Sequence, residues 1–308
     1  MNTVSNVSRF GISRKMVASQ TSASWRHIPH VSYIFDIDLT ELLPKIKALN
    51  EEIAKDGHHV TLNTVMIRAI CMAISQGAPK LNSHLHFEQK LVRGKLTTYK
   101  DMDVNLPILT DSGRTVTANL HGLNNKTLGE INDCIADFQR RLKKTNLDEA
   151  LYRVSYNDTL GFLKSGDIPK AVFRLIGSKT GKKHRVKQLK GAEKKAYDAI
   201  PSTEKLTDAD VKQGTITISN IGSITRSVPG EVAMLMIVPP QVCAIGLGSA
   251  TKKPVVETDE NGEDKVVIKT MLPADIVFDH RVFDFEDIVP FLEKLKEIIA
   301  NPDELLVY

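Results

Sequence analysis

The stretch VVIKTMLPADIVFDHRVFDFED, from Val266 to Asp287, joins a long apolar run to a cluster of charged side chains. The apolar run is typical of a buried β-strand, and it ends at His280. Asp284 follows four residues later at the start of a predicted helix, where a carboxylate interacts favourably with the helix dipole. A lone histidine in such a place is more often a packed core residue than a catalytic base. Evidence from the rest of the chain is needed to choose between these two interpretations.

Strand and helix patterns alternate through most of the chain. Residues 30–39 alternate as a strand does, and a helix is expected to follow with Thr40 as its N-cap. An apolar helix is expected from Thr61 to Gly77. The other expected elements are an amphipathic helix over 125–144, strands near Leu85, Leu91, Val104 and Val116 with a turn at 110–114, strands over 214–223, 241–250 and 266–280, and a helix over 285–299. This order predicts an α/β fold, more closely a two-layer α+β fold with a mixed sheet and flanking helices.

The composition indicates a globular intracellular protein. The 308 residues are 42% hydrophobic, which is enough to fill a core. No stretch reaches the ~18 apolar residues that a transmembrane helix needs. Three scattered cysteines indicate neither a disulfide framework nor a zinc site, so a cytoplasmic location is expected. Residues 1–35 lack acidic side chains and are rich in Ser and Arg, as mitochondrial transit peptides are, so a mitochondrial location is the alternative.

A basic segment interrupts the pattern between about residues 146 and 205. Eight Lys or Arg residues lie between Lys179 and Lys195, against a single Glu. A solvated basic lobe is the favoured interpretation, and binding of phosphate or another polyanion is the alternative. The formal net charge of the whole chain is +4, which does not favour nucleic acid as a partner.

Three segments of the last third resemble, in order and spacing, the signatures of one acyltransferase family. They are GTITISNIGS at 214–223, PPQVCAIGLGSATKKPVV at 239–256 and DHRVFD at 279–284. The family is the catalytic core of 2-oxo acid dehydrogenase complexes, which is related to chloramphenicol acetyltransferase. The resemblance extends over residues 12–145 and 206–308. It implies a chloramphenicol acetyltransferase-like, trimeric catalytic domain over residues 29–308, with an N-terminal arm at residues 1–28 and an insert at about residues 146–205.

The resemblance also implies roles for individual residues. His280 matches the general base that removes a proton from the thiol of coenzyme A or dihydrolipoyl, a task suited to an imidazole with a pKa near ~6.5. Ser219 matches the hydroxyl that stabilises the tetrahedral oxyanion, and one such donor contributes about 3–4 kcal/mol. Asp284 matches an aspartate that supports the loop through an ion pair. Arg14 is the candidate for its partner, and an exposed arginine on a flexible arm is the alternative interpretation of that residue.

Two departures from the family leave other functions open. Phe285 stands where the family has glycine, so a non-catalytic trimeric scaffold and acyl transfer to a hydroxyl or amine are alternatives. Coenzyme A is expected as the acyl-CoA substrate, without residues assigned to bind it. No covalent lipoyl group is expected on this chain, since Glu260 stands where a lipoyl hairpin has its lysine. No metal is expected, because His84 and His86 have no third ligand nearby in the sequence.

The resemblance further implies an assembly. Trimers are expected to form the active site between subunits, so that His280 of one chain faces Ser219 of its neighbour. NPDELLVY at 301–308 resembles the family's apolar tail, which hooks a neighbouring trimer and would be unusual to leave in water. A larger cage built from trimers is therefore possible, and a separate lipoyl-bearing protein is a candidate partner.

Overall fold

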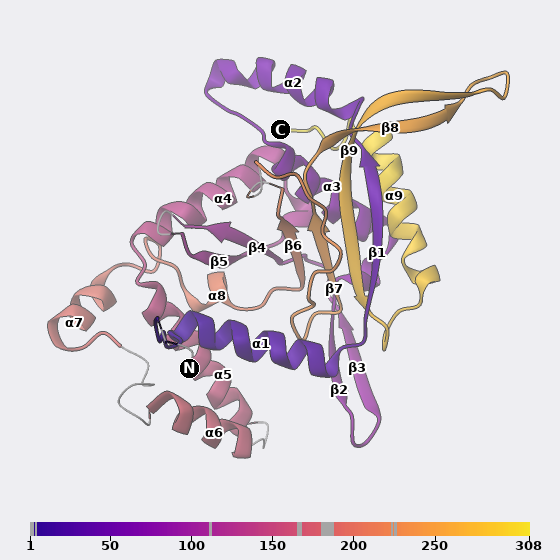
Figure 1. Cartoon of the computed structure of the whole chain (residues 1–308). Coiled ribbons are helices and arrows are strands. Elements are labelled where there is room, and N and C mark those ends of the chain that lie inside the picture. The colour runs from indigo at the N-terminus through magenta and orange to yellow at the C-terminus, as the bar shows by residue number, and fades with distance from the viewer. Residues whose placement is uncertain are drawn as a thin grey trace. The chain divides into compact units, whose positions relative to one another are not determined.

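The computed structural model describes residues 3, 5–110, 113–164, 168–179, 188–222, 224 and 227–308. The chain divides into two compact units, which Figure 1 shows together. The first unit contains Met1–Ala23 and Ala136–Lys212, and the second contains Ser24–Ile135 and Gln213–Tyr308. Helices α1 (Ile12–His27) and α4 (Leu128–Lys143) each contribute residues to both.

A mixed sheet of seven strands forms the second unit, counted over the described residues. Its order is β1 (His30–Asp38), β9 (Asp264–Asp279), β7 (Cys243–Leu247), β6 (Ile216–Asn220), β4 (Val104–Leu109) and β5 (Thr115–Leu120), with β8 (Thr251–Thr258) paired to the outer half of β9. The pairs β4–β6 and β6–β7 are parallel, and the other pairs are antiparallel. Strands β2 (Ser83–Glu88) and β3 (Arg93–Thr98) form a separate ribbon. The prediction of a mixed sheet with flanking helices is confirmed.

The two faces of this sheet are covered differently. Helices α3 (Leu62–Gly77) and α9 (Val289–Ala300) pack against each other and lie together beside the sheet in Figure 1. A separate cluster joins Ala244 of β7 and Val277 of β9 to Ile28 and Ile237, with Leu235 packed against it. Every residue of β7 is buried, as is the second half of β9. Near-continuous apolar sequence in these strands follows from burial on both faces.

Two local predictions need correction. Helix α2 (Leu42–Ile53) begins after Glu41, which makes no side-chain cap, so the prediction of Thr40 as N-cap is wrong. The Thr40 hydroxyl instead accepts the backbone N–H of Thr270 at 3.1 Å, which ties it to β9. The strand expected near Leu91 is β3, which begins later than expected, at Arg93, because Leu91 lies in the turn after β2. The predicted cap Thr61 does accept the backbone N–H of Thr64, at 3.1 Å.

The C-terminal tail is bound to its own chain rather than left as a free tip. Leu305 is fully buried. The guanidinium of Arg68 donates to the carbonyl of Leu305 at 3.1 Å and also to that of Val307. The backbone N–H of Leu128 donates to the same Val307 carbonyl at 3.1 Å. Within one chain most of the apolar tail is therefore already shielded from water, although Val307 keeps 48% of its surface exposed.

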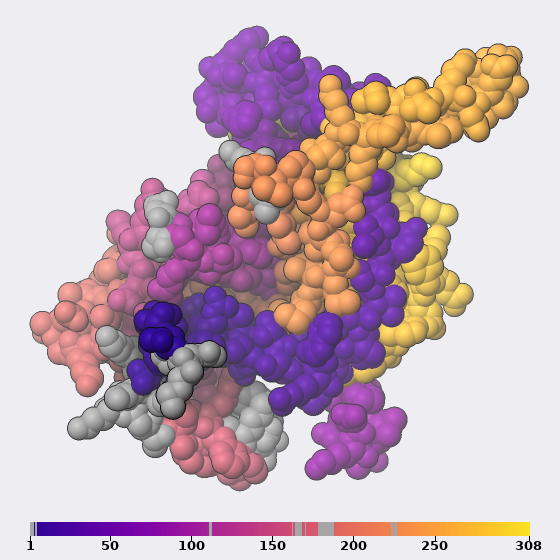
Figure 2. Space-filling view, in the orientation of Figure 1, coloured from indigo at the N-terminus to yellow at the C-terminus, as the bar shows by residue number. Residues whose placement is uncertain are grey.

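A hairpin of β8 and the outer half of β9 projects from the second unit, as Figure 2 shows. Val256, Val266 and Ile268 on this hairpin are each more than 60% exposed, at 61%, 70% and 64%. Val256 pairs directly with Val266, and Pro254 pairs with Ile268. The sequence analysis did not predict β8 as a strand.

The first unit is helical. It contains α5 (Leu147–Lys164), α6 (Ile168–Lys179), α7 (Gly191–Ala199) and α8 (Asp208–Val211), together with the N-terminal part of α1. A bidentate pair between Arg141 of α4 and the buried Asp210 of α8, with contacts of 2.8 and 2.7 Å, joins its two ends. The predicted insert at 146–205 lies inside this unit, and the predicted arm at 1–28 contains α1. The domain boundaries proposed from the sequence remain predictions.

The contact between α3 and α9 leaves no room for a side chain at Gly77. A Cβ there would lie 2.5 Å from the backbone oxygen of Pro290 and 3.0 Å from Cβ of Lys294. We expect Gly77→Ala to lower the free energy of unfolding by about 1–3 kcal/mol, the cost of overpacking. Urea unfolding followed by circular dichroism measures the change. Gly161→Ala is the matched control, since it adds the same methyl group to a helix where nothing lies within 4 Å; equal stability of the two variants would contradict the prediction.

Candidate functional site

Ser219 and His280 belong to the same sheet but lie far apart within one chain. Ser219 in β6 pairs with Gly246 in β7, which in turn pairs with Asp275 in β9. His280 follows the end of β9, five residues beyond Asp275. At about 3.3 Å per residue along a strand, these five residues separate the two side chains by about 15 Å or more. One chain therefore does not bring the predicted base and the predicted oxyanion donor together.

The hydrogen bonds of His280 fix which ring nitrogen is free. Its Nδ1 lies 2.9 Å from the carbonyl oxygen of Phe283, so Nδ1 carries the proton and donates it to that oxygen. Nε2 is then the unprotonated nitrogen that can accept a proton. The side chain is 53% exposed, and the backbone N–H donates to the carbonyl of Pro29 at 3.0 Å. His280 is thus not a packed core histidine, because it presents a basic nitrogen from a fixed loop.

A buried ion pair shapes the turn that carries His280. Asp279 is fully buried at the end of β9, and its Oδ1 accepts the backbone N–H of Arg281 at 3.0 Å and the Nε–H at 2.9 Å. The Arg281 guanidinium also lies over the ring of Phe87. A buried carboxylate needs such a partner to stay ionised. The sequence analysis missed this pair, although the acid and the base two residues apart in DHR were the available signal.

Asp284 begins the short helix η4 (Phe285–Asp287). Its side chain and that of Asp287 cap each other's backbone N–H groups, and Asp284 Oδ1 lies 3.5 Å from Nδ1 of His280. The carboxylate is 75% exposed, which fits a capping role. Arg14 lies on α1 in the first unit and is exposed, so its ion pair with Asp284 remains a prediction.

Phe285 has a definite place. Its ring packs edge-on against that of Tyr33 in β1, with centroids 4.8 Å apart and an interplanar angle of 71°. Such an arrangement is favourable for aromatic pairs. The replacement of glycine therefore does not leave an unpacked side chain beside Asp284.

Asp275 is the functional candidate that the sequence analysis did not single out. It is fully buried, and its Oδ2 accepts the backbone N–H of Leu235 at 3.1 Å. Its Oδ1 has no hydrogen-bond partner among the described residues. Burial raises the pKa of this carboxyl to about 6, although nearby amides of Leu235, Gly246 and Asp275 itself act to lower it. A lone acid within the apolar run LPADIVF was the available signal.

The raised pKa of Asp275 gives a sign for the pH dependence of stability. Between pH about 4 and 6 the folded protein holds a proton that the unfolded chain has released, so stability falls as the pH rises through this window and stays level above it. Asp275→Asn removes the titration. We expect the variant to be more stable than the parent at pH 7, by about 2–3 kcal/mol at 1.36 kcal/mol per pKa unit, and equally stable near pH 4.

Urea unfolding of parent and variant at four pH values between 4 and 7 measures this difference. Asp36→Asn is the matched control, because it removes the same charge from β1, where Asp36 pairs with Lys253 at 2.9 Å on the surface. We expect that variant to stay within about 0.5 kcal/mol of the parent at each pH. Parallel pH profiles for the parent and Asp275→Asn would contradict the assignment.

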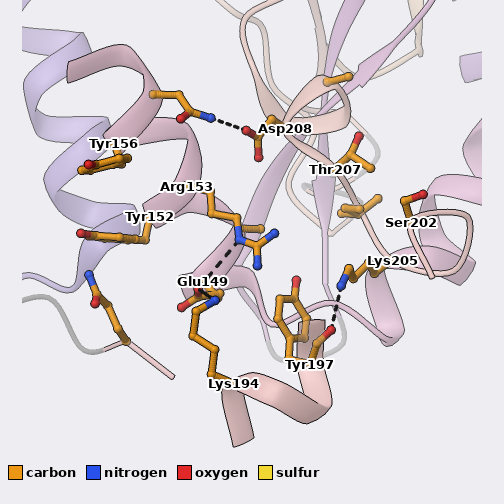
Figure 3. A pocket seen from close by; sticks show the side chains of 15 residues that line it. Glu149, Tyr152, Arg153, Tyr156, Lys194, Tyr197, Ser202, Lys205, Thr207 and Asp208 are labelled. Carbon is orange, nitrogen blue, oxygen red and sulfur yellow. Dashed lines mark hydrogen bonds and ion pairs between the residues drawn. The ribbon is translucent and has the colours of Figure 1, made fainter. Parts of the chain in front are cut away.

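A pocket of about 750 Å³ lies within the first unit, and Figure 3 shows its lining. Its cations are already paired. Lys194 contacts Glu149 at 3.1 Å and Asp198 at 3.0 Å, and Arg153 pairs with the same two acids. The buried Lys205 donates to the carbonyl of Tyr197 at 2.7 Å and to that of Asp198 at 3.3 Å, which caps the end of α7.

This pairing bears on the basic segment from Lys179 to Lys195. Lys194, within that segment, is neutralised by its two acids, which lowers the charge available for an outside anion. Residues 180–187 of the segment lie outside the described part of the chain. Polyanion binding by the whole segment remains an untested alternative.

Metal ligation finds no support in the described residues, among which no group of three His, Cys, Asp or Glu side chains is placed to hold a metal ion. His84 uses both ring nitrogens in hydrogen bonds, to the carbonyl of Gly214 at 3.0 Å and to the hydroxyl of Tyr99 at 3.0 Å. Within the same described ranges, none of the helices combines the length and apolar character needed to cross a bilayer.

A comparison with protein families places the chain. The model of the 2-oxoacid dehydrogenases acyltransferase (catalytic domain) matches residues 3–152 and 184–307. The chain belongs to this family. The residues between the two matched ranges, 153–183, fall within the insert predicted from the sequence.

Known relatives are larger than this chain. The dihydrolipoyllysine-residue succinyltransferase component of the 2-oxoglutarate dehydrogenase complex of Rickettsia bellii is 37% identical over 122 residues, 39% of this chain and 27% of that protein. The dihydrolipoyllysine-residue acetyltransferase component of the pyruvate dehydrogenase complex of Staphylococcus epidermidis is 24% identical over 294 residues, 96% of this chain and 51% of that protein. The chain thus spans about half or less of the length of these relatives.

A solved structure shares the fold. The dihydrolipoamide acetyltransferase of Azotobacter vinelandii superposes with a TM-score of 0.65 at 18% identity, covering 98% of this chain and 94% of that chain. That structure was determined to study the roles of a serine, a histidine and an asparagine in the catalytic mechanism of that enzyme.

Proposed function

We propose that this chain is a coenzyme A-dependent acyltransferase that moves an acyl group between a thioester and a thiol. The thiol belongs to coenzyme A, to a dihydrolipoyl group on a separate lipoyl-bearing protein, or to another acceptor. The observation that carries the proposal is the state of His280, a half-exposed imidazole whose Nδ1–H is bound to the Phe283 carbonyl and whose Nε2 is free to take a proton. Membership of the acyltransferase family supports the same chemistry.

The reaction follows from these groups. Nε2 of His280 takes the proton of the incoming thiol as its sulfur attacks the thioester carbon. The carbonyl oxygen becomes an oxyanion, and the Ser219 hydroxyl donates a hydrogen bond to it. When the tetrahedral intermediate collapses, the carbon–sulfur bond to the original thiol breaks, and the departing sulfur receives the proton from His280. The acyl group has then moved to the new sulfur, and the imidazole is neutral again.

The separation of Ser219 from His280 within one chain supports a site shared between chains. We propose a trimer in which His280 of one chain faces Ser219 of its neighbour. A C3 assembly uses the same heterologous contact three times and so contains three equivalent sites. A larger cage that uses the C-terminal tail fits the partial exposure of Val307. We propose a cytoplasmic location for this assembly, with the mitochondrion as the alternative.

Loss of either group defines the first test. We expect His280→Ala to lower kcat by about 10²–10⁴-fold, the usual contribution of a general base. We expect Ser219→Ala to lower it by about 10²–10³-fold, the effect of one oxyanion donor. The measurement is thiol release from acetyl-coenzyme A with free dihydrolipoamide as acceptor, and with succinyl-coenzyme A, hydroxyl and amine acceptors in parallel. Parent-like turnover of His280→Ala would rule out the proposed role.

Mixing the two inactive variants tests the shared site. Co-refolded at equal amounts, His280→Ala and Ser219→Ala chains should regain about a quarter of the parent activity, because a quarter of the contacts in a cyclic assembly then pair an intact histidine with an intact serine. A site within one chain would regain nothing. Sedimentation of the mixture, with each variant alone as its control, verifies that trimers have formed in every sample.

The non-catalytic scaffold is the weaker alternative. It was suggested by Phe285, which packs against Tyr33 and so has a structural place that does not require loss of the site. The scaffold function would be favoured if the parent forms trimers but releases no thiol with any pair of acyl-coenzyme A and acceptor.

A further inference from the structure

Asp275 and Ser219 lie in one row across the sheet. The row runs from Ser219 in β6 through Gly246 in β7 and Asp275 in β9 to Ile34 in β1. Laterally paired residues point to the same face of a sheet, so the side chains of Ser219 and Asp275 share a face. Gly246 stands between them without a side chain.

The carboxyl of Asp275 occupies the place that Gly246 leaves open. A Cβ on Gly246 would overlap Oδ1 of Asp275, so this oxygen stands over β7 on the side of Ser219. Adjacent strands lie about 4.7–4.9 Å apart, which puts Oδ1 about one strand spacing from the Ser219 side chain. A rotation of the carboxyl or a single bridging water spans that gap.

One end of this gap carries a buried oxygen that is left unsatisfied within the described chain. Oδ1 of Asp275 has no hydrogen-bond partner there, whereas Oδ2 is held by the backbone N–H of Leu235. Ser219 is 8% exposed, so its hydroxyl is also largely shielded from solvent. The unsatisfied Asp275 oxygen and the Ser219 hydroxyl are therefore placed to act as donor and acceptor across β7.

The charged groups around Asp275 do not neutralise it. On the elements packed against it, the titratable side chains include His30, Asp36 and Asp38 of β1, Cys243 of β7, Lys253 of β8 and Glu231 in the segment before β7. Lys253 is taken up by Asp36 at 2.9 Å and by Glu231 at 2.8 Å. Nε2 of His30 accepts the backbone N–H of Ile237 at 3.2 Å, and burial lowers the pKa of His30. Burial, followed by the charge of Asp275, raises the pKa of the Cys243 thiol.

We propose that Asp275 is a positioning residue that sets the direction of the Ser219 hydroxyl. As a carboxylic acid, Asp275 donates toward Ser219 Oγ, directly or through one water, and leaves the single Ser219 O–H for the oxyanion. As a carboxylate, it accepts that O–H, withdraws the donor from the reaction and places a negative charge beside the developing oxyanion. This inference rests on the proposed function, because it concerns the oxyanion donor of that reaction.

The consequence is a pH dependence that His280 alone does not produce. A general base makes the rate rise as the pH rises through the pKa of the imidazole. Ionisation of Asp275 lowers the rate as the pH rises, because in every site where Asp275 is ionised the Ser219 hydroxyl no longer donates to the oxyanion. The protein then favours acyl transfer in the range where the base is free and the buried carboxyl still holds its proton.

A double-mutant cycle tests the inference. The proteins are the parent, Asp275→Asn, Ser219→Ala and the double variant, and kcat is measured from pH 5 to 8 with saturating acetyl-coenzyme A and dihydrolipoamide. The amide of asparagine is a permanent donor that does not titrate. We expect the ratio of kcat for Asp275→Asn to that of the parent to rise about tenfold or more across this range. In the Ser219→Ala background the same ratio should stay constant.

Further variants distinguish positioning of Ser219 from a general structural effect of Asp275. Asp275→Ala also lacks a titrating carboxyl, but alanine has no hydrogen-bond donor. At pH 5 its kcat should therefore differ more from that of the parent than the kcat of Asp275→Asn does. Asp36→Asn should leave the pH profile unchanged. A constant ratio in the serine-containing pair, or the same rise without Ser219, would overturn the inference while leaving the acyltransferase proposal intact. An inactive parent would instead overturn the proposed function, and the inference with it.

Discussion

The structure of the second unit depends on strand β9. It pairs with β1 and β7 along its inner half and with β8 along its outer half, so one strand of sixteen residues holds three others in register. Its inner half is buried on both faces, where its backbone groups must be satisfied by neighbouring strands. Strand β9 positions two groups of the proposed site. His280 follows its last residue, and Asp275 lies in the same row across the sheet as Ser219. The geometry of the proposed active site thus depends on sheet register.

Burial on both faces explains why this strand could be read from the sequence. Apolar runs and helix periodicity were sufficient for most elements of the second unit, including the long helix α3 with its cap Thr61. The errors have local causes. Thr40 has the side chain of a good cap but uses its hydroxyl to hold β9, a contact distant in sequence. Strand β8 is half polar and exposed, so it lacks the burial that makes a strand recognisable.

The site was partly visible in the sequence for a different reason. His280 and Ser219 could be named through resemblance, because motifs preserve residue type and order. A site shared between chains was expected only through the same resemblance. The residues themselves do not show how far apart the two lie in one chain, because that distance depends on which residues pair across β6, β7 and β9. Asp275 shows this limit clearly: it is one acid in an apolar run, and its significance appears only when Gly246 is found beneath it. The Asp279–Arg281 pair was missed because its importance comes from the full burial of Asp279, which the short spacing in DHR does not reveal.

The projecting hairpin carries a hazard that its sequence counteracts. An open strand edge with exposed valine and isoleucine side chains invites pairing with strands of other molecules, which leads to aggregation. β8 contains Lys252, Lys253 and Pro254 in succession. Proline has no N–H to donate to a foreign strand, and the exposed Lys252 would bring like charges together in a self-pairing. Lys252 and Pro254 thus protect this strand edge from foreign pairing, and a Pro254→Val exchange would weaken the protection without touching the fold's interior.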